Sequence, residues 1–121
     1  MFWRGKIKTA IASAAPPENV DFVLDKSGLR EYFDVVMNAG HVIKGKPDPE
    51  IYLKTAQKLA CSPRSCLVFE DSIPGLIAAK NAGMKVIALT TTYPPAELKD
   101  ADYIISDFTE IDLNRMGLDY S

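Results

Sequence analysis

Short apolar runs alternate along the chain with longer stretches of mixed polarity. Residues 66–69 and 86–89 are uninterrupted apolar segments of four residues, typical of strands that are buried on both faces. Residues 7–12 instead alternate in polarity and lead to Ser13, which is typical of a half-buried strand. The same criteria predict strands at residues 33–37 and 103–105.

Helix signals lie between these strands. The helices are expected to open at Pro16-Pro17-Glu18 and at Asp48-Pro49-Glu50, and to cover residues 75–82, with a weak fourth over residues 111–116. Gly28 and Gly83 are the expected stops, and Ser72 is a candidate N-cap. The residues expected on buried helix faces are Val20, Val23, Leu24, Ile51, Thr55, Ala56 and Leu59. Strands that alternate with helices predict an α/β fold, a Rossmann-like parallel sheet flanked by helices.

Composition narrows the function classes. With 121 residues, the chain is expected to form one domain over residues 1–121. A formal net charge of -2 argues against nucleic acid as a partner, and no apolar run reaches the length of a membrane span. The chain has two cysteines and one histidine, His41, which argues against a zinc site, and His41 is assigned to an exposed loop. Reduced cysteines fit a cytoplasmic location.

Two adjacent acids, Glu70 and Asp71, follow the apolar run of residues 66–69. In an open parallel sheet, the carboxyl ends of the strands form the ligand-binding edge. Paired carboxylates at that edge suit Mg²⁺, which prefers oxygen ligands. The alternative is an acidic helix start, because carboxylates also favour the positive end of a helix dipole.

Ser13 and Lys46 are the other chemically interesting residues, since Ser13 ends the first strand and Lys46 lies in a loop after the second. A hydroxyl, a lysine and an acidic pair with Mg²⁺ form a set suited to phosphate binding. Taken singly, Ser13 fits a polar strand end or helix cap, and Lys46 fits a solvated loop lysine. Tyr52 and Cys66 are assigned to the core.

Three motifs resemble those of the haloacid dehalogenase-like hydrolase superfamily, in the branch of β-phosphoglucomutase and phosphoglycolate phosphatase. They are Ile11-Ala12-Ser13, the segment from Gly45-Lys46-Pro47 to Tyr52, and Phe69-Glu70-Asp71-Ser72 with the small residues that follow it. The resemblance implies that Ser13 and Lys46 bind phosphate, that Lys46 is also catalytic, and that Glu70 and Asp71 hold Mg²⁺. It also implies a small phosphorylated metabolite as substrate.

The family's first motif, a hydrophobic strand followed by Asp-x-Asp, has no counterpart here. The twelve residues before Ser13 contain no acid, and Asp100-Ala101-Asp102 precedes a strand and is expected to be a solvated turn. In the family, the strand of that motif lies in the middle of the sheet. The chain therefore resembles the C-terminal part of such an enzyme's core, and we expect it to be inactive alone because the nucleophile is missing.

Two other function classes remain to be compared. A non-catalytic α/β module would use an open sheet edge for homo-oligomerisation, for partner binding, or for complementation by an N-terminal fragment. A response-regulator receiver domain has a similar length but needs its acidic pair early and its lysine late, the reverse of the order found here.

Overall fold

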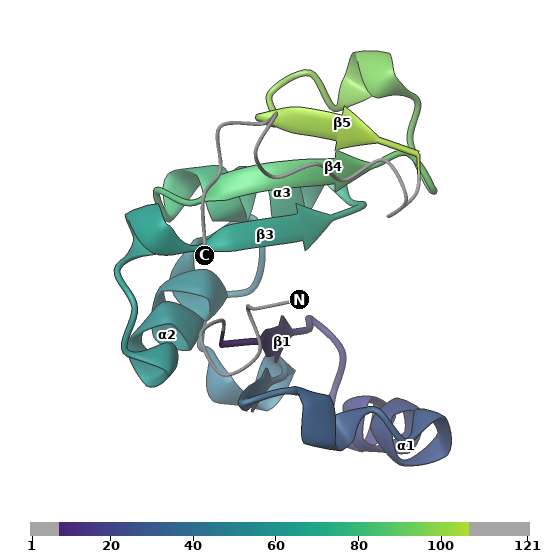
Figure 1. The fold of residues 1–121 in the computed structure, drawn as a ribbon, viewed down its shortest axis with the longest axis vertical. Coiled ribbons are helices and arrows are strands. Elements are labelled where there is room, and N and C mark those ends of the chain that lie inside the picture. The colour runs from purple at the N-terminus through teal and green to yellow at the C-terminus, as the bar shows by residue number, and fades with distance from the viewer. Residues whose placement is uncertain (1–7, 107–121) are drawn as a thin grey trace, which may run out of the picture.

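The computed structural model describes residues 8–106, whose strands are all parallel and form two groups. In the first group, β1 (Ala10–Ala12) pairs with β2 (Val35–Met37), so that Ile11 lies beside Val36. In the second, β3 (Leu67–Glu70) pairs with β4 (Lys85–Leu89), which pairs with β5 (Tyr103–Ile105). Within the described residues no ladder joins β1 to β3, and Figure 1 shows β1 lying apart from β3, β4 and β5. The α/β class predicted from the sequence is confirmed.

Three helices connect the strands: α1 (Pro17–Ser27), α2 (Glu50–Leu59) and α3 (Ile73–Asn81). Helix α2 packs against β1, β2 and α3, and it therefore links the two groups of strands. Helix α1 lies at the end of the molecule remote from β5 (Figure 1). Four single turns of 3-10 helix complete the described secondary structure, at Arg30–Tyr32, Ala39–His41, Pro63–Ser65 and Pro95–Glu97.

The observed starts of α1, α2 and α3 lie within two residues of the predicted ones. Helix α1 ends at Gly28, whose φ of 71° lies in the left-handed region that glycine adopts without strain. The hydroxyl of Ser72 accepts a hydrogen bond from the amide of Gly75 and caps α3, which begins two residues earlier than predicted. The predicted helix over residues 111–116 lies outside the described residues.

Two strands are shorter than the apolar pattern predicts. Strand β2 begins at Val35 rather than at residue 33, because the amide of Phe33 donates to the carbonyl of Arg30 and closes a 3-10 turn. Strand β1 begins at Ala10. Strand β2 therefore begins only after the turn at Arg30–Tyr32 has ended.

The main core lies between the strands, α2 and α3. Its buried side chains include Met37, Ile51, Ala56, Leu76 and Val86. The prediction for α1 is wrong at Val23, which is 61% exposed. Val20 and Leu24, four residues apart, form a narrow buried stripe on this peripheral helix, and Val23 lies to its side. Leu59, expected on the inner face of α2, is only half-buried.

Cys61 and Cys66 are free, half-buried thiols. Burial raises the pKa of the Cys66 thiol, with a smaller contribution from Cys61. Among residues 8–106, no helix is both long and apolar enough to cross a membrane.

Candidate functional site

Glu70, the last residue of β3, lies at the centre of a buried polar cluster. Only 9% of the residue is exposed. Its Oε2 accepts hydrogen bonds from Lys46 Nζ at 2.9 Å and from the Tyr52 hydroxyl at 2.6 Å. Its Oε1 accepts from the Ser72 hydroxyl at 3.1 Å and from the amides of Asp71 and Ser72 at 3.2 and 3.3 Å. Both carboxylate oxygens are thus engaged by the protein.

This set of donors keeps Glu70 ionised. Burial alone raises the pKa of its carboxyl, but the hydrogen bonds from Tyr52 and Lys46, the charge of Lys46 and the hydrogen bond from Ser72 together exceed that effect and lower the pKa. The same environment raises the pKa of the Tyr52 phenol, first through burial and then through the charge of Glu70. The cluster therefore contains a carboxylate, an ammonium and a neutral phenol.

Lys46 joins the ends of the two groups of strands. Besides Glu70, which ends β3, its ammonium donates to the carbonyl of Ala12, the last residue of β1, at 3.3 Å. The side chain is only 12% exposed, so Lys46 is not a solvated loop lysine. An ammonium has three N–H donors, and these contacts use two of them.

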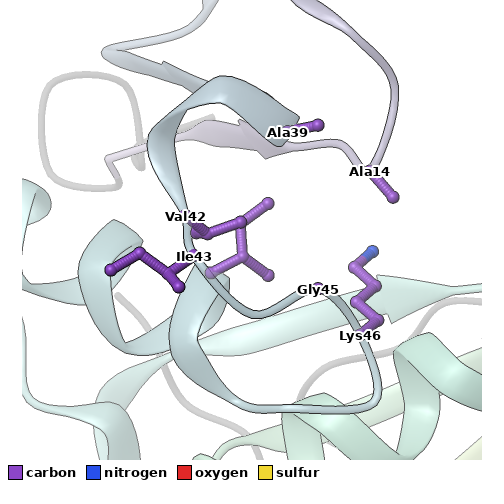
Figure 2. Close-up of a pocket in the computed structure, with 7 residues that line it drawn as sticks. Ala14, Ala39, Val42, Ile43, Gly45 and Lys46 are labelled. Carbon is purple, nitrogen blue, oxygen red and sulfur yellow. The ribbon is translucent and has the colours of Figure 1, made fainter.

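Beside Lys46 lies a small cavity of about 150 Å³. Figure 2 shows Lys46 extending towards Ala14, with the side chains of Val42 and Ile43 across from it. Its lining is apolar apart from Lys46.

Ser13 follows β1 directly and lies next to Ala12, the residue whose carbonyl binds Lys46. Its amide donates to the carbonyl of Met37 at 3.0 Å, and its hydroxyl accepts from the amide of Ala15 at 3.1 Å. No side chain caps α1, so Ser13 is not a helix cap. Its hydroxyl hydrogen remains able to donate.

Asp71 differs from its neighbour Glu70, since it is exposed. Its Oδ2 accepts from the hydroxyls of Thr91 and Thr92, in the loop after β4, at 3.3 and 3.2 Å. Helix α3 has no acid in its first turn, and its cap is Ser72, so the helix-start explanation does not account for this pair. Asp71 and the threonine hydroxyls are hard oxygen donors suited to Mg²⁺. Within residues 8–106, no group of three His, Cys, Asp or Glu side chains is arranged to hold a metal ion.

Several supporting residues were missed by the sequence reasoning. Tyr52 is buried as predicted, but its hydroxyl belongs to the polar cluster. Gly75 packs against Glu70 so closely that a Cβ there would lie 2.0 Å from the Glu70 carboxyl carbon. The sequence indicated Ser72 only as an N-cap, and nothing in it linked Gly75 or Tyr52 to Glu70.

Glu50 holds the loop that precedes Lys46. Its carboxylate accepts from the amides of Ile43 and Lys44 at 3.0 and 2.9 Å and pairs with Lys54 at 2.9 Å. These interactions, those of the two amides first, lower the pKa of Glu50 to about 2. The sequence placed this acid only at the start of a helix and gave no signal for its contacts with the loop. Asp48 acts as expected at the helix start, since its carboxylate accepts from the amide of Glu50.

The predicted solvated turn at residues 100–102 is confirmed, since these residues form a turn in which Asp102 is exposed, but Asp102 also makes structural contacts. Its carboxylate accepts from the amide of Val86 at 2.7 Å and pairs with Lys80 at 3.2 Å. Val86 pairs with Val68 near the start of that ladder, whereas Glu70 pairs with Ala88 at its other end. Asp102 therefore anchors β5 to β4 at a distance from the site.

A family model described as haloacid dehalogenase-like hydrolase matches residues 2–83. The chain belongs to this family. It is 33% identical over 112 residues to validoxylamine A 7'-phosphate phosphatase of Streptomyces hygroscopicus subsp. limoneus, covering 93% of this chain and 53% of that protein.

Solved structures agree with this assignment. The β-phosphoglucomutase of Clostridium difficile superposes with a TM-score of 0.82 at 27% identity, over 94% of this chain and 49% of the other. CbbY of Rhodobacter sphaeroides in complex with phosphate superposes with a TM-score of 0.83 at 32% identity, over 95% of this chain and 53% of the other. The chain thus spans about half the length of these relatives, and the resemblance inferred from its motifs is confirmed.

Proposed function

We propose that this chain supplies the phosphate-binding half of a Mg²⁺-dependent phosphohydrolase or phosphomutase that acts on small phosphorylated metabolites. The single observation that carries the proposal is Lys46, a nearly buried ammonium held between the ends of β1 and β3 with one N–H donor left over. A buried cation at the carboxyl edge of a parallel sheet is suited to binding a phosphoryl group. The phosphatase similarity and the phosphate-bound relative support this substrate class.

Each residue has a proposed role. Lys46 neutralises a phosphoryl oxygen, and the Ser13 hydroxyl donates a hydrogen bond to another. Asp71 takes Mg²⁺, which would offset phosphoryl charge when bound. Glu70 was expected to bind the metal too, but both its oxygens already accept hydrogen bonds, and we propose that it mainly holds Lys46 in place.

Phosphate binding tests the proposal directly. Inorganic phosphate with Mg²⁺ should bind the wild-type chain in isothermal titration calorimetry, and Lys46→Met should weaken binding at least about tenfold, the scale expected from the loss of a charge-assisted hydrogen bond. Lys44→Met, which changes a neighbouring exposed lysine, is the matched control. Equal affinity of the Lys46 variant and the wild type would rule Lys46 out as the phosphate ligand.

We further propose that the chain does not hydrolyse phosphomonoesters alone, because no Asp-x-Asp follows a strand in its sequence. Incubation with p-nitrophenyl phosphate and Mg²⁺ should release no product above that of Asp71→Asn. Turnover that Asp71→Asn abolishes would show that an acid within this chain accepts or activates the phosphoryl group.

The interrupted sheet favours a second candidate, a role in association. Since β1 and β3 share no ladder within residues 8–106, we propose that a strand of a second copy, or of an N-terminal fragment, can complete the sheet. Sedimentation equilibrium should then show self-association or complex formation that Asp71→Asn leaves unchanged. A monomer that binds no such fragment would exclude this role.

A further inference from the structure

Lys46 is restrained by Tyr52 as well as by Glu70. Tyr52 lies in the first turn of α2, six residues beyond Lys46, and is only 6% exposed. Its ring lies below the lysine ammonium, with 5.0 Å between Nζ and the ring centroid. This distance falls within the range of cation–π interactions.

The Tyr52 hydroxyl reaches the same partner as the lysine. It donates to Glu70 Oε2 at 2.6 Å, a length typical of a strong hydrogen bond to a charged oxygen, and Lys46 donates to that oxygen at 2.9 Å. Tyr52 therefore contacts the ammonium through its ring and shares its counter-ion through its hydroxyl.

We propose that Tyr52 is a positioning residue that holds the Lys46 ammonium in the geometry needed to bind a phosphoryl oxygen. The phosphate role rests on the proposed function above, whereas the restraint on Lys46 rests on the contacts alone. A free lysine loses rotamer freedom when it binds a ligand, and holding the side chain beforehand removes part of that cost.

The hydroxyl has a separate effect from the ring. Because it supplies a second donor to Glu70 Oε2, the carboxylate does not depend on Lys46 alone for compensation of its charge. Without the hydroxyl, Lys46 is the only remaining donor that the described residues provide to that oxygen, and an incoming phosphate must compete with a less satisfied carboxylate. If Tyr52 only filled space, phenylalanine at this position would serve equally well.

Nuclear magnetic resonance of protein labelled with ¹³C at lysine separates these effects. In the wild type, the Lys46 ε-methylene protons should be shifted upfield by the ring and should show nuclear Overhauser effects to the Tyr52 ring protons. Tyr52→Phe should retain the upfield shift, and Tyr52→Leu should return the resonance to the position of the exposed lysines. Tyr32→Leu changes an exposed tyrosine and is the matched control.

Phosphate titrations of the same samples test the consequence for binding. We expect Tyr52→Phe to weaken inorganic phosphate binding about threefold and Tyr52→Leu about tenfold, the range set by a lost hydrogen bond and a lost cation–π contact. Tyr32→Leu should bind like the wild type. Thermal unfolding of each variant shows whether a change in affinity accompanies a loss of folded protein.

The outcomes distinguish this proposal from the proposed function. If phosphate leaves the wild-type Lys46 resonance unmoved, the phosphate role fails, and the wild-type Overhauser effects still decide whether Tyr52 restrains the lysine. If those effects are absent, the positioning role is wrong, even where Tyr52→Leu does not fold. Equal phosphate affinity of the wild type and the folded Tyr52→Phe and Tyr52→Leu variants would also overturn it and leave Tyr52 a packing residue.

Discussion

Glu70 can occupy its place because residue 75 has no side chain. A Cβ at Gly75 would lie 2.0 Å from both Cδ and Oε2 of Glu70, closer than any tolerated contact. We expect Gly75→Ala to lower the free energy of unfolding by about 1–3 kcal/mol, because the carboxylate and its donors must shift. Urea denaturation measures this change. Gly45→Ala, at a glycine with no atom within 4 Å of the added Cβ, should change stability little, and equal effects of the two variants would contradict the steric explanation.

Glu50 should make stability depend on pH. Its pKa is about 2 in the folded protein, against about 4.3 in an unfolded chain. The carboxylate therefore stabilises the fold above the unfolded value, and this contribution is lost as pH falls from about 5 towards 2. The wild type should have a higher free energy of unfolding than Glu50→Gln at pH 6, and this difference should be smaller at pH 3. A gap that stays constant over this range would show that the amide contacts of Glu50 do not persist in solution.

At the scale of elements, α1 is held by a narrow stripe of side chains. Leu24 is buried and Val23 is exposed, although they are adjacent. Leu24→Ala should cost about 2–5 kcal/mol of unfolding free energy, the usual range for a truncated core leucine. Val23→Ala should stay within about 0.5 kcal/mol, as for other surface substitutions. Chemical denaturation of both variants checks this difference, and a large loss in the Val23 variant would show that a partner covers this side of the helix.

Local signals predicted the elements that depend on local causes. The continuous apolar runs of β3 and β4 and the caps at Ser72 and Gly28 each act within a few residues, so the sequence was sufficient. The lengths of β1 and β2 were overestimated, and for β2 the reason is that an apolar pattern does not show where the preceding turn ends. The exposure of Val23 depends on how far α1 lies from the rest of the core, which periodicity does not encode.

The candidate site was predictable in position but not in its internal contacts. Strand ends predicted where Lys46, Glu70 and Asp71 would lie, since parallel strands direct their carboxyl ends to one edge. The hydrogen bond from Tyr52 to Glu70 joins residues that are 18 positions apart in the sequence. The bonds from Thr91 and Thr92 to Asp71 join residues 20 and 21 positions apart. Such contacts depend on the packing of α2 and the loop after β4, and a single sequence gives no signal for them.

At the scale of the whole molecule, ligand binding should raise the free energy of unfolding. A ligand that binds only the folded chain stabilises it by about 2.7 kcal/mol at a concentration 100 times its dissociation constant. For a domain of 121 residues, each kcal/mol raises the melting temperature by about 4 °C. Mg²⁺ and inorganic phosphate together should therefore raise the melting temperature of the wild-type chain. Differential scanning calorimetry measures the shift.

Two variants separate the contributions of phosphate and Mg²⁺ to this rise in melting temperature. Lys46→Met should lose the increment due to phosphate, because it removes the buried ammonium at the strand ends. Asp71→Asn should lose the increment due to Mg²⁺ and keep most of that due to phosphate, since Asp71 is exposed and its carboxylate accepts hydrogen bonds from Thr91 and Thr92. Loss of both increments in Asp71→Asn would mean that phosphate binds only through the metal. A full Mg²⁺ increment in that variant would instead place the cation at Glu70, in competition with Lys46 and Tyr52 for its carboxylate.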